Sequence, residues 1–122
     1  MQVPPCALIV EDEILLALQL KDAMAALGFH VSGLAPTPDR ARFLAESEAP
    51  DVVLMDVSLQ GGREGIEAAR WMREVCGAEI VFVTGHTDRE TLERIESQVP
   101  GAPVLGKPVN PKHLAAAVRA LL

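Results

Sequence analysis

Short apolar runs alternate with longer stretches of mixed polarity along the whole chain of 122 residues. The apolar runs have the length of buried strands and cover residues 7–10, 30–34, 52–55, 80–83 and 103–105. Helices are predicted over residues 12–27, from a cap at Thr37 to about residue 48, over a segment that includes residues 66–72, over about 88–97, and after a cap at Asn110. The chain therefore reads as five strands in alternation with five helices.

Glycines and prolines mark several predicted boundaries. Gly28 is placed to stop the first helix, and Pro50 to end the second. Gly61, Gly62 and Gly65 are assigned to a flexible loop after the third strand. They act there as turn residues, or they keep that loop open to an approaching partner.

The third strand, residues 52–55, is apolar on both faces. Strands of this kind, separated by helices, predict a parallel sheet that is covered on both sides. Right-handed crossovers then favour a doubly wound α/β fold. In such sheets, ligands bind beyond the carboxyl ends of the strands.

Composition narrows the range of functions. One compact domain over residues 1–122 fits the length, and the formal net charge of −6 argues against direct nucleic-acid binding. No apolar stretch is long enough for a membrane span, and the start does not resemble a signal peptide. Cys6 and Cys76 fit no zinc spacing and are interpreted as free thiols, so we expect a cytoplasmic protein.

Polar residues follow four of the predicted strands. Glu11 and Asp12 come after the first strand, Asp56 after the third, Thr84 after the fourth and Lys107 after the fifth. Since the carboxyl ends of parallel strands share one edge of the sheet, we expect these side chains to converge there.

The expected cluster has a definite chemistry. Carboxylates with room for water and phosphate suit Mg²⁺, a lysine supplies a point charge for a phosphate oxygen, and a threonine hydroxyl can hydrogen-bond another. A carboxylate beside a metal can itself attack phosphorus and form an aspartyl phosphate.

Each residue also has a simpler interpretation. Asp12 can be a helix N-cap, with Glu11 and Glu13 favourable at the positive end of the helix. Asp56 can cap a loop, and Lys107 can be a solvated surface lysine. Thr84 can be an ordinary β-branched strand residue.

The motifs LIVEDE, VVLMDVSL and VFVTGH, followed by Lys107-Pro108, resemble the CheY-like receiver domains of bacterial two-component response regulators. The resemblance covers nearly the whole chain. It implies a flavodoxin-like sheet with strand order 2-1-3-4-5 and helices on both faces. The segment from Phe82 to His86 resembles a subgroup with a Phe-x-Thr-Gly motif, whose members are often stand-alone receivers.

The resemblance also implies roles for the strand-end residues. Asp56 is the expected phosphoacceptor, and Glu11, Asp12, Asp56 and the backbone carbonyl of Ser58 are the expected Mg²⁺ ligands. Thr84 corresponds to the switch hydroxyl and Lys107 to the lysine that contacts the phosphoryl group. The Lys107-Pro108 bond is often cis in such relatives.

One position departs from the family pattern. Receivers usually carry an aromatic residue three positions before the lysine, and this chain has Val104 there. We therefore predict that switching works through the loop after Thr84 and the charged helix that follows. His86 lies in this loop, and a partly exposed histidine without a special role is the simpler interpretation.

The expected function is a conformational signalling switch in a phosphorelay. A histidine kinase or histidine phosphotransfer protein would supply the phosphoryl group, and a downstream protein would read the result. The chain would catalyse only its own phosphorylation and dephosphorylation. A phosphate-independent interaction module with the same fold is the alternative, and homodimer formation stays open.

Overall fold

The computed structural model describes residues 3–59 and 64–122. The strands alternate with the helices in chain order. The strands are β1 (Cys6–Val10), β2 (His30–Ala35), β3 (Val52–Met55), β4 (Glu79–Thr84) and β5 (Val104–Gly106). The helices are α1 (Ile14–Ala26), α2 (Pro38–Glu48), α3 (Glu64–Cys76), α4 (Arg89–Gln98) and α5 (Pro111–Leu121).

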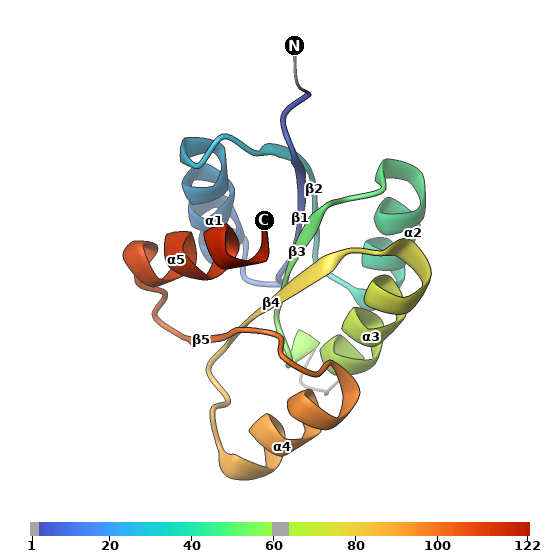
Figure 1. Ribbon diagram of the computed structural model, residues 1–122, viewed down its shortest axis with the longest axis vertical. Helices are drawn as coiled ribbons and strands as arrows, with labels where there is room; N and C mark the ends of the chain where they lie inside the picture. The colour runs from blue at the N-terminus through green and yellow to red at the C-terminus, as the bar shows by residue number, and fades with distance from the viewer. Residues whose placement is uncertain (1–2, 60–63) are drawn as a thin grey trace.

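The strands form one parallel sheet in the order β2-β1-β3-β4-β5, which confirms the predicted doubly wound topology. Figure 1 shows α1 and α5 on one side of this sheet and α2 and α3 on the other, and α4 follows α3 and packs in the same layer through Ile95. The chain runs from β1 outward to β2 and then returns past β1 to β3, so the strand order reverses between β1 and β3. That reversal is the place where open α/β sheets bind ligands.

The sheet divides the hydrophobic core into two layers because its central strands are buried on both faces. Alternate residues of β1 enter opposite layers: Leu8 and Val10 face the layer under α2 and α3, and Ala7 and Ile9 face the layer under α1 and α5. Most of the buried side chains are aliphatic, as the composition predicts. The strand ends are therefore packed between these two core layers, one on each face of the sheet.

Side-chain caps confirm three of the predicted helix starts. Thr37 accepts a hydrogen bond from the Arg40 amide at 3.2 Å, and Asn110 accepts one from the Lys112 amide at 2.8 Å. Asp88 caps α4 in the same way through the Thr91 amide at 3.1 Å. Each cap satisfies an amide that has no partner within its helix.

Two boundaries differ from the prediction. The first helix begins at Ile14 rather than at Asp12, and its N-cap position is Glu13. Gly65 lies within α3 rather than in the preceding loop, so its assignment to a flexible loop was wrong. Gly61 and Gly62 lie outside the described residues.

Helix α1 is apolar on more than its inner face. It buries Ala17, Leu20 and Met24 against the sheet, yet Ile14 and Leu15 near its start are 63% and 76% exposed.

Among the helices of residues 3–59 and 64–122, none has the length and apolar character needed to cross a bilayer.

Candidate functional site

Sheet hydrogen bonds fix the backbone of the residues that follow the strands. The Glu11 amide donates to Ala35 O at 3.0 Å, and the Asp56 amide donates to Val10 O at 2.9 Å. At the other side of the sheet, the Lys107 amide donates to Thr84 O at 2.9 Å. These residues therefore continue the β-ladder by one position and start from well-defined backbone positions.

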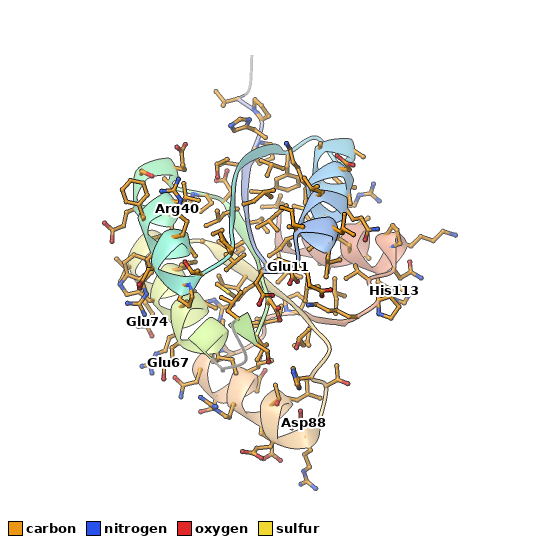
Figure 2. The ribbon with its side chains drawn as sticks, turned by 180° about the vertical axis from the view of Figure 1, so that it is seen from behind. Glu11, Arg40, Glu67, Glu74, Asp88 and His113 are labelled. Atoms are coloured by element: carbon orange, nitrogen blue, oxygen red, sulfur yellow. The ribbon has the colours of Figure 1, made fainter. Side chains whose placement is uncertain are left out.

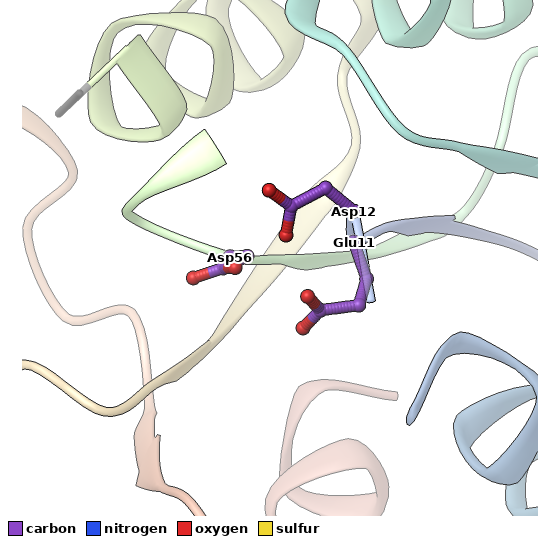
Figure 3. Close-up of side chains that lie close together, drawn as sticks. All are labelled: Glu11, Asp12 and Asp56. Carbon is purple, nitrogen blue, oxygen red and sulfur yellow. The ribbon is translucent and has the colours of Figure 1, made fainter. Parts of the chain in front are cut away.

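The three predicted acidic residues come together at this edge. One carboxylate oxygen from each of Glu11, Asp12 and Asp56 lies within 4.8 Å of the other two. Figure 3 shows the three side chains close together. Glu11 and Asp56 are only 3% and 4% exposed, whereas Asp12 faces solvent. In Figure 2, Glu11 lies near the middle of the molecule, at the end of the sheet. The cluster is thus buried on one side and open on the other.

The side chain of Lys107 supplies positive charge to this cluster. Its Nζ lies 2.9 Å from Glu11 Oε1 and 3.3 Å from Asp56 Oδ2. Glu13 Oε2 is farther away, at 3.8 Å, on a well exposed side chain. Lys107 therefore links the acids of β1 and β3 from the far side of β4.

Backbone amides orient the two buried carboxylates. The Ser58 amide donates to Asp56 Oδ1 at 3.1 Å, and the Glu13 amide donates to Glu11 Oε2 at 3.1 Å. Glu11 Oε1 is buried and lies in ion-pair contact with Lys107, but no donor in the described ranges makes an aligned hydrogen bond to it. One oxygen of each buried acid is thereby fixed, and the other faces the Lys107 ammonium.

Burial and neighbouring charges shift the pKa values of Glu11 and Lys107. Loss of solvent raises the pKa of Glu11 above its ordinary value of 4.5, and the charge of Asp56 adds to this, while Lys107 and the Glu13 amide act in the opposite direction. Burial also disfavours the Lys107 ammonium, but Glu11 and Asp56 outweigh that effect and its pKa is raised. The lysine is therefore a cation at neutral pH.

Thr84 and its loop lie beside the charged cluster. Thr84 is fully buried at the end of β4, and its Oγ1 accepts a hydrogen bond from the His86 amide at 2.9 Å. His86 itself is exposed, as the simpler interpretation expected. The hydroxyl keeps its own hydrogen for a further acceptor, which is what the role of a switch hydroxyl requires.

The donor set fits a hard divalent cation. Two of the carboxylates are buried and close together, a combination that is costly without a compensating positive charge. Glu11 Oε1 is a buried acceptor without an aligned donor in the described part of the chain. Oxygen ligands that leave room for water suit Mg²⁺ better than a transition metal.

The structure corrects one alternative and adds one residue. Asp12 is not the N-cap of α1, because that position is Glu13. Sequence reasoning overlooked the contact of Gly65 with the backbone that carries Asp56. A glycine inside a predicted helix would have indicated a close backbone contact. Gly65 was instead assigned to the loop before that helix. The Lys107-Pro108 peptide bond is cis, as it often is in the receivers that the sequence resembles.

Comparisons with known proteins agree with this arrangement. The family model of the response regulator receiver domain matches residues 7–119. The chain is 32% identical over 113 residues to the phyllosphere-induced regulator PhyR of Methylorubrum extorquens, a match that covers 91% of the chain and 41% of that protein. It is 37% identical over 92 residues to the transcriptional regulatory protein PdtaR of Mycobacterium tuberculosis, with coverage of 75% and 44%. The chain thus spans less than half the length of these two relatives.

Solved structures share the fold over almost the entire chain. The signal receiver domain of a modulated diguanylate cyclase from Desulfovibrio desulfuricans G20 superimposes with a TM-score of 0.87 at 32% identity, over 98% of this chain and 94% of that one. The response regulator PhyR from Brucella abortus gives a TM-score of 0.80 at 30% identity, over 99% and 49%. On the matched motifs, the strand order and these likenesses, the chain belongs to the family of response regulator receiver domains.

Proposed function

We propose that this chain is a phosphorylation-dependent switch that accepts a phosphoryl group on Asp56. The observation that carries the proposal is the meeting of Glu11, Asp12 and Asp56, with carboxylate oxygens within 4.8 Å of one another, at an edge that also holds the Lys107 ammonium. Receiver domains of this family are signalling switches, and they bind Mg²⁺ at an acidic pocket. A single receiver domain over residues 1–122 is part of the proposal.

Each side chain has a defined task in this reaction. Asp56 Oδ attacks the phosphorus of a phosphohistidine, the P–N bond breaks, and the leaving imidazole takes up a proton. Glu11, Asp12, Asp56 and the Ser58 carbonyl would hold Mg²⁺, which neutralises phosphoryl charge when bound. Lys107 then turns from the carboxylates to a phosphoryl oxygen, and the Thr84 hydroxyl donates to another.

The proposed partners are a histidine kinase or a histidine phosphotransfer protein upstream and another protein downstream. The exposed apolar residues Ile14, Leu15 and Leu18 at the start of α1 support a protein partner at this edge, because they directly follow the acidic residues. The chain would act on no substrate other than its own Asp56. The free thiols Cys6 and Cys76 suit the reducing cytoplasm that we propose as its compartment.

The test is intact mass after incubation with a small-molecule phosphodonor and Mg²⁺, for the wild type and for Asp56→Asn. We expect one added phosphoryl group in the wild type, and none in the variant or without Mg²⁺. No added mass, under conditions in which another receiver domain is labelled, would favour the phosphate-independent interaction module instead.

A further inference from the structure

The backbone conformation of Gly65 does not require a glycine. It is the second residue of α3, and its φ lies outside the left-handed region that favours glycine. Within a helix, alanine is more stable than glycine by about 0.5–1 kcal/mol. The position must therefore need glycine for space rather than for backbone freedom.

The space around Gly65 is occupied by the backbone that carries the phosphoacceptor. A Cβ at Gly65 would overlap the carbonyl oxygen of Asp56, and it would lie 2.9 Å from both the Cα and the carbonyl oxygen of Val57. These are main-chain atoms, which cannot rotate away as the tip of a side chain can. The Gly65 amide also donates to Val57 O at 3.3 Å. The first turn of α3 thus rests directly on residues 56 and 57.

This contact closes a clamp around the phosphoacceptor segment. On one side, the Asp56 amide is bound to Val10 O of β1 at 2.9 Å. On the other side, α3 is held to the core by buried Ile66 and Ala69. Any shift of α3 away from the sheet would release residues 56 and 57. It would also displace Ser58, whose amide orients the Asp56 carboxylate at 3.1 Å.

We propose that Gly65 is a positioning residue for phosphoryl transfer. Its missing Cβ lets α3 hold the backbone of Asp56 and Val57 at the depth where the Asp56 carboxylate meets Glu11 and Asp12. This inference rests on the proposed function, because it assigns Gly65 to the same reaction.

The test compares Gly65→Ala with Gly33→Ala. A Cβ at Gly33, in β2, would lie 2.9 Å from Leu44 Cδ1, the movable tip of a side chain, and Gly33 is not part of the site. Mg²⁺ affinity and the phosphorylation rate at saturating phosphodonor are measured at a temperature where all three proteins are folded. We expect both to fall at least about tenfold in Gly65→Ala, since misplacement of a reacting group by about 1 Å is that costly. Gly33→Ala should stay within about twofold of the wild type because its added methyl displaces only a side-chain tip.

A folded Gly65→Ala protein with wild-type Mg²⁺ affinity and phosphorylation rate would overturn the inference and leave the proposed function intact. If the wild type takes up no phosphoryl group, the proposed function fails and the role of Gly65 in phosphoryl transfer fails with it, while the Mg²⁺ affinities still decide whether Gly65 positions the acidic site. If Gly65→Ala does not fold, the wild type is titrated with Mg²⁺ by amide NMR. The Gly65 amide should then shift with the same midpoint as the Ser58 amide, and a Gly65 amide that stays fixed while Ser58 shifts would refute the clamp.

Discussion

The ammonium of Lys107 lies 2.9 Å from a carboxylate oxygen of Glu11, although the two residues follow strands that are separated by β3 and β4. The same ammonium is 3.3 Å from Asp56. Lys107 therefore compensates the two buried acids before any metal or phosphoryl group arrives. A metal cation bound to Glu11 and Asp56 would compete with the Lys107 ammonium for the same carboxylates. This competition leads to the first prediction.

Replacing Lys107 by methionine should destabilise the metal-free protein by about 2 kcal/mol, because two buried carboxylates lose their counter-charge while the lysine itself is partly solvated. Mg²⁺ should bind more tightly to the variant and recover this loss, since no ammonium competes for the site. Urea unfolding with EDTA and with excess Mg²⁺ measures both effects. Lys112→Met, on the exposed side of α5, is the control. Equal stability of the two variants without Mg²⁺ would contradict the pairing of Lys107 with the acids.

The raised pKa of Glu11 predicts a pH dependence of the metal-free stability. A carboxyl whose pKa is higher in the folded state binds its proton more strongly there, so its contribution is favourable at low pH and is lost as the pH rises through the folded pKa. The wild type should therefore gain stability relative to Glu11→Gln as the pH falls from neutral toward 4.5, the ordinary value. Urea titrations of both proteins between about pH 7.5 and pH 4.5, with EDTA, check the sign. A wild type that loses stability relative to Glu11→Gln over this interval would show that burial does not dominate at Glu11.

The hydrogen bond from the His86 amide to Thr84 Oγ1 offers a route from the site to α4. His86→Pro removes this donor, whereas His86→Ala keeps it. If the bond carries the signal, phosphorylation should change amide exchange across residues 84–97 in the wild type and in His86→Ala. The response should be weaker by about fivefold in His86→Pro, which corresponds to one hydrogen bond of about 1 kcal/mol. An undiminished response in His86→Pro would exclude this route, and no response in any of the proteins would contradict switching through this segment.

Two arginine–aromatic contacts on α2 should differ in their value for stability. The Arg42 guanidinium lies 5.5 Å from the ring centroid of Trp71 and thereby joins α2 to α3, whereas Arg40 stacks 5.1 Å from Phe43 within α2. Arg42→Ala should lower the free energy of unfolding by about 1 kcal/mol, and Arg40→Ala by about 0.5 kcal/mol or less, because Phe43 is exposed. Urea unfolding of both variants measures the two losses in the free energy of unfolding. A larger loss in Arg40→Ala would reverse the assignment.

The strand ends were the most predictable part of the molecule. Strands that are apolar on both faces predict a parallel sheet, and the carboxyl ends of such strands share an edge, so the sequence alone places Glu11, Asp56 and Lys107 together. The caps at Thr37 and Asn110 follow from local chemistry in the same way.

What the sequence could not provide was the partner of each side chain. Lys107 was expected to contact a phosphoryl oxygen. Nothing in the sequence indicates that it pairs with Glu11 before a phosphoryl group is present. A helix cap at Asp12 was the simpler alternative to a metal ligand, yet the helix begins at Ile14, after Glu13. Gly65 was read as a loop residue because glycine usually interrupts helices, and only the backbone of Asp56 beside it explains its place.

The main-chain hydrogen bonds that extend the sheet to Glu11, Asp56 and Lys107 have a consequence for how such a domain can diversify. These three charged residues occupy the last positions of the β-ladder, and the connecting loops start only after them. Exchanges at exposed loop positions other than Asp12 and Ser58 would alter the outline that an approaching protein encounters, while the charges beneath keep their places. New partner specificity could thus be acquired, or engineered, without rebuilding the reaction centre.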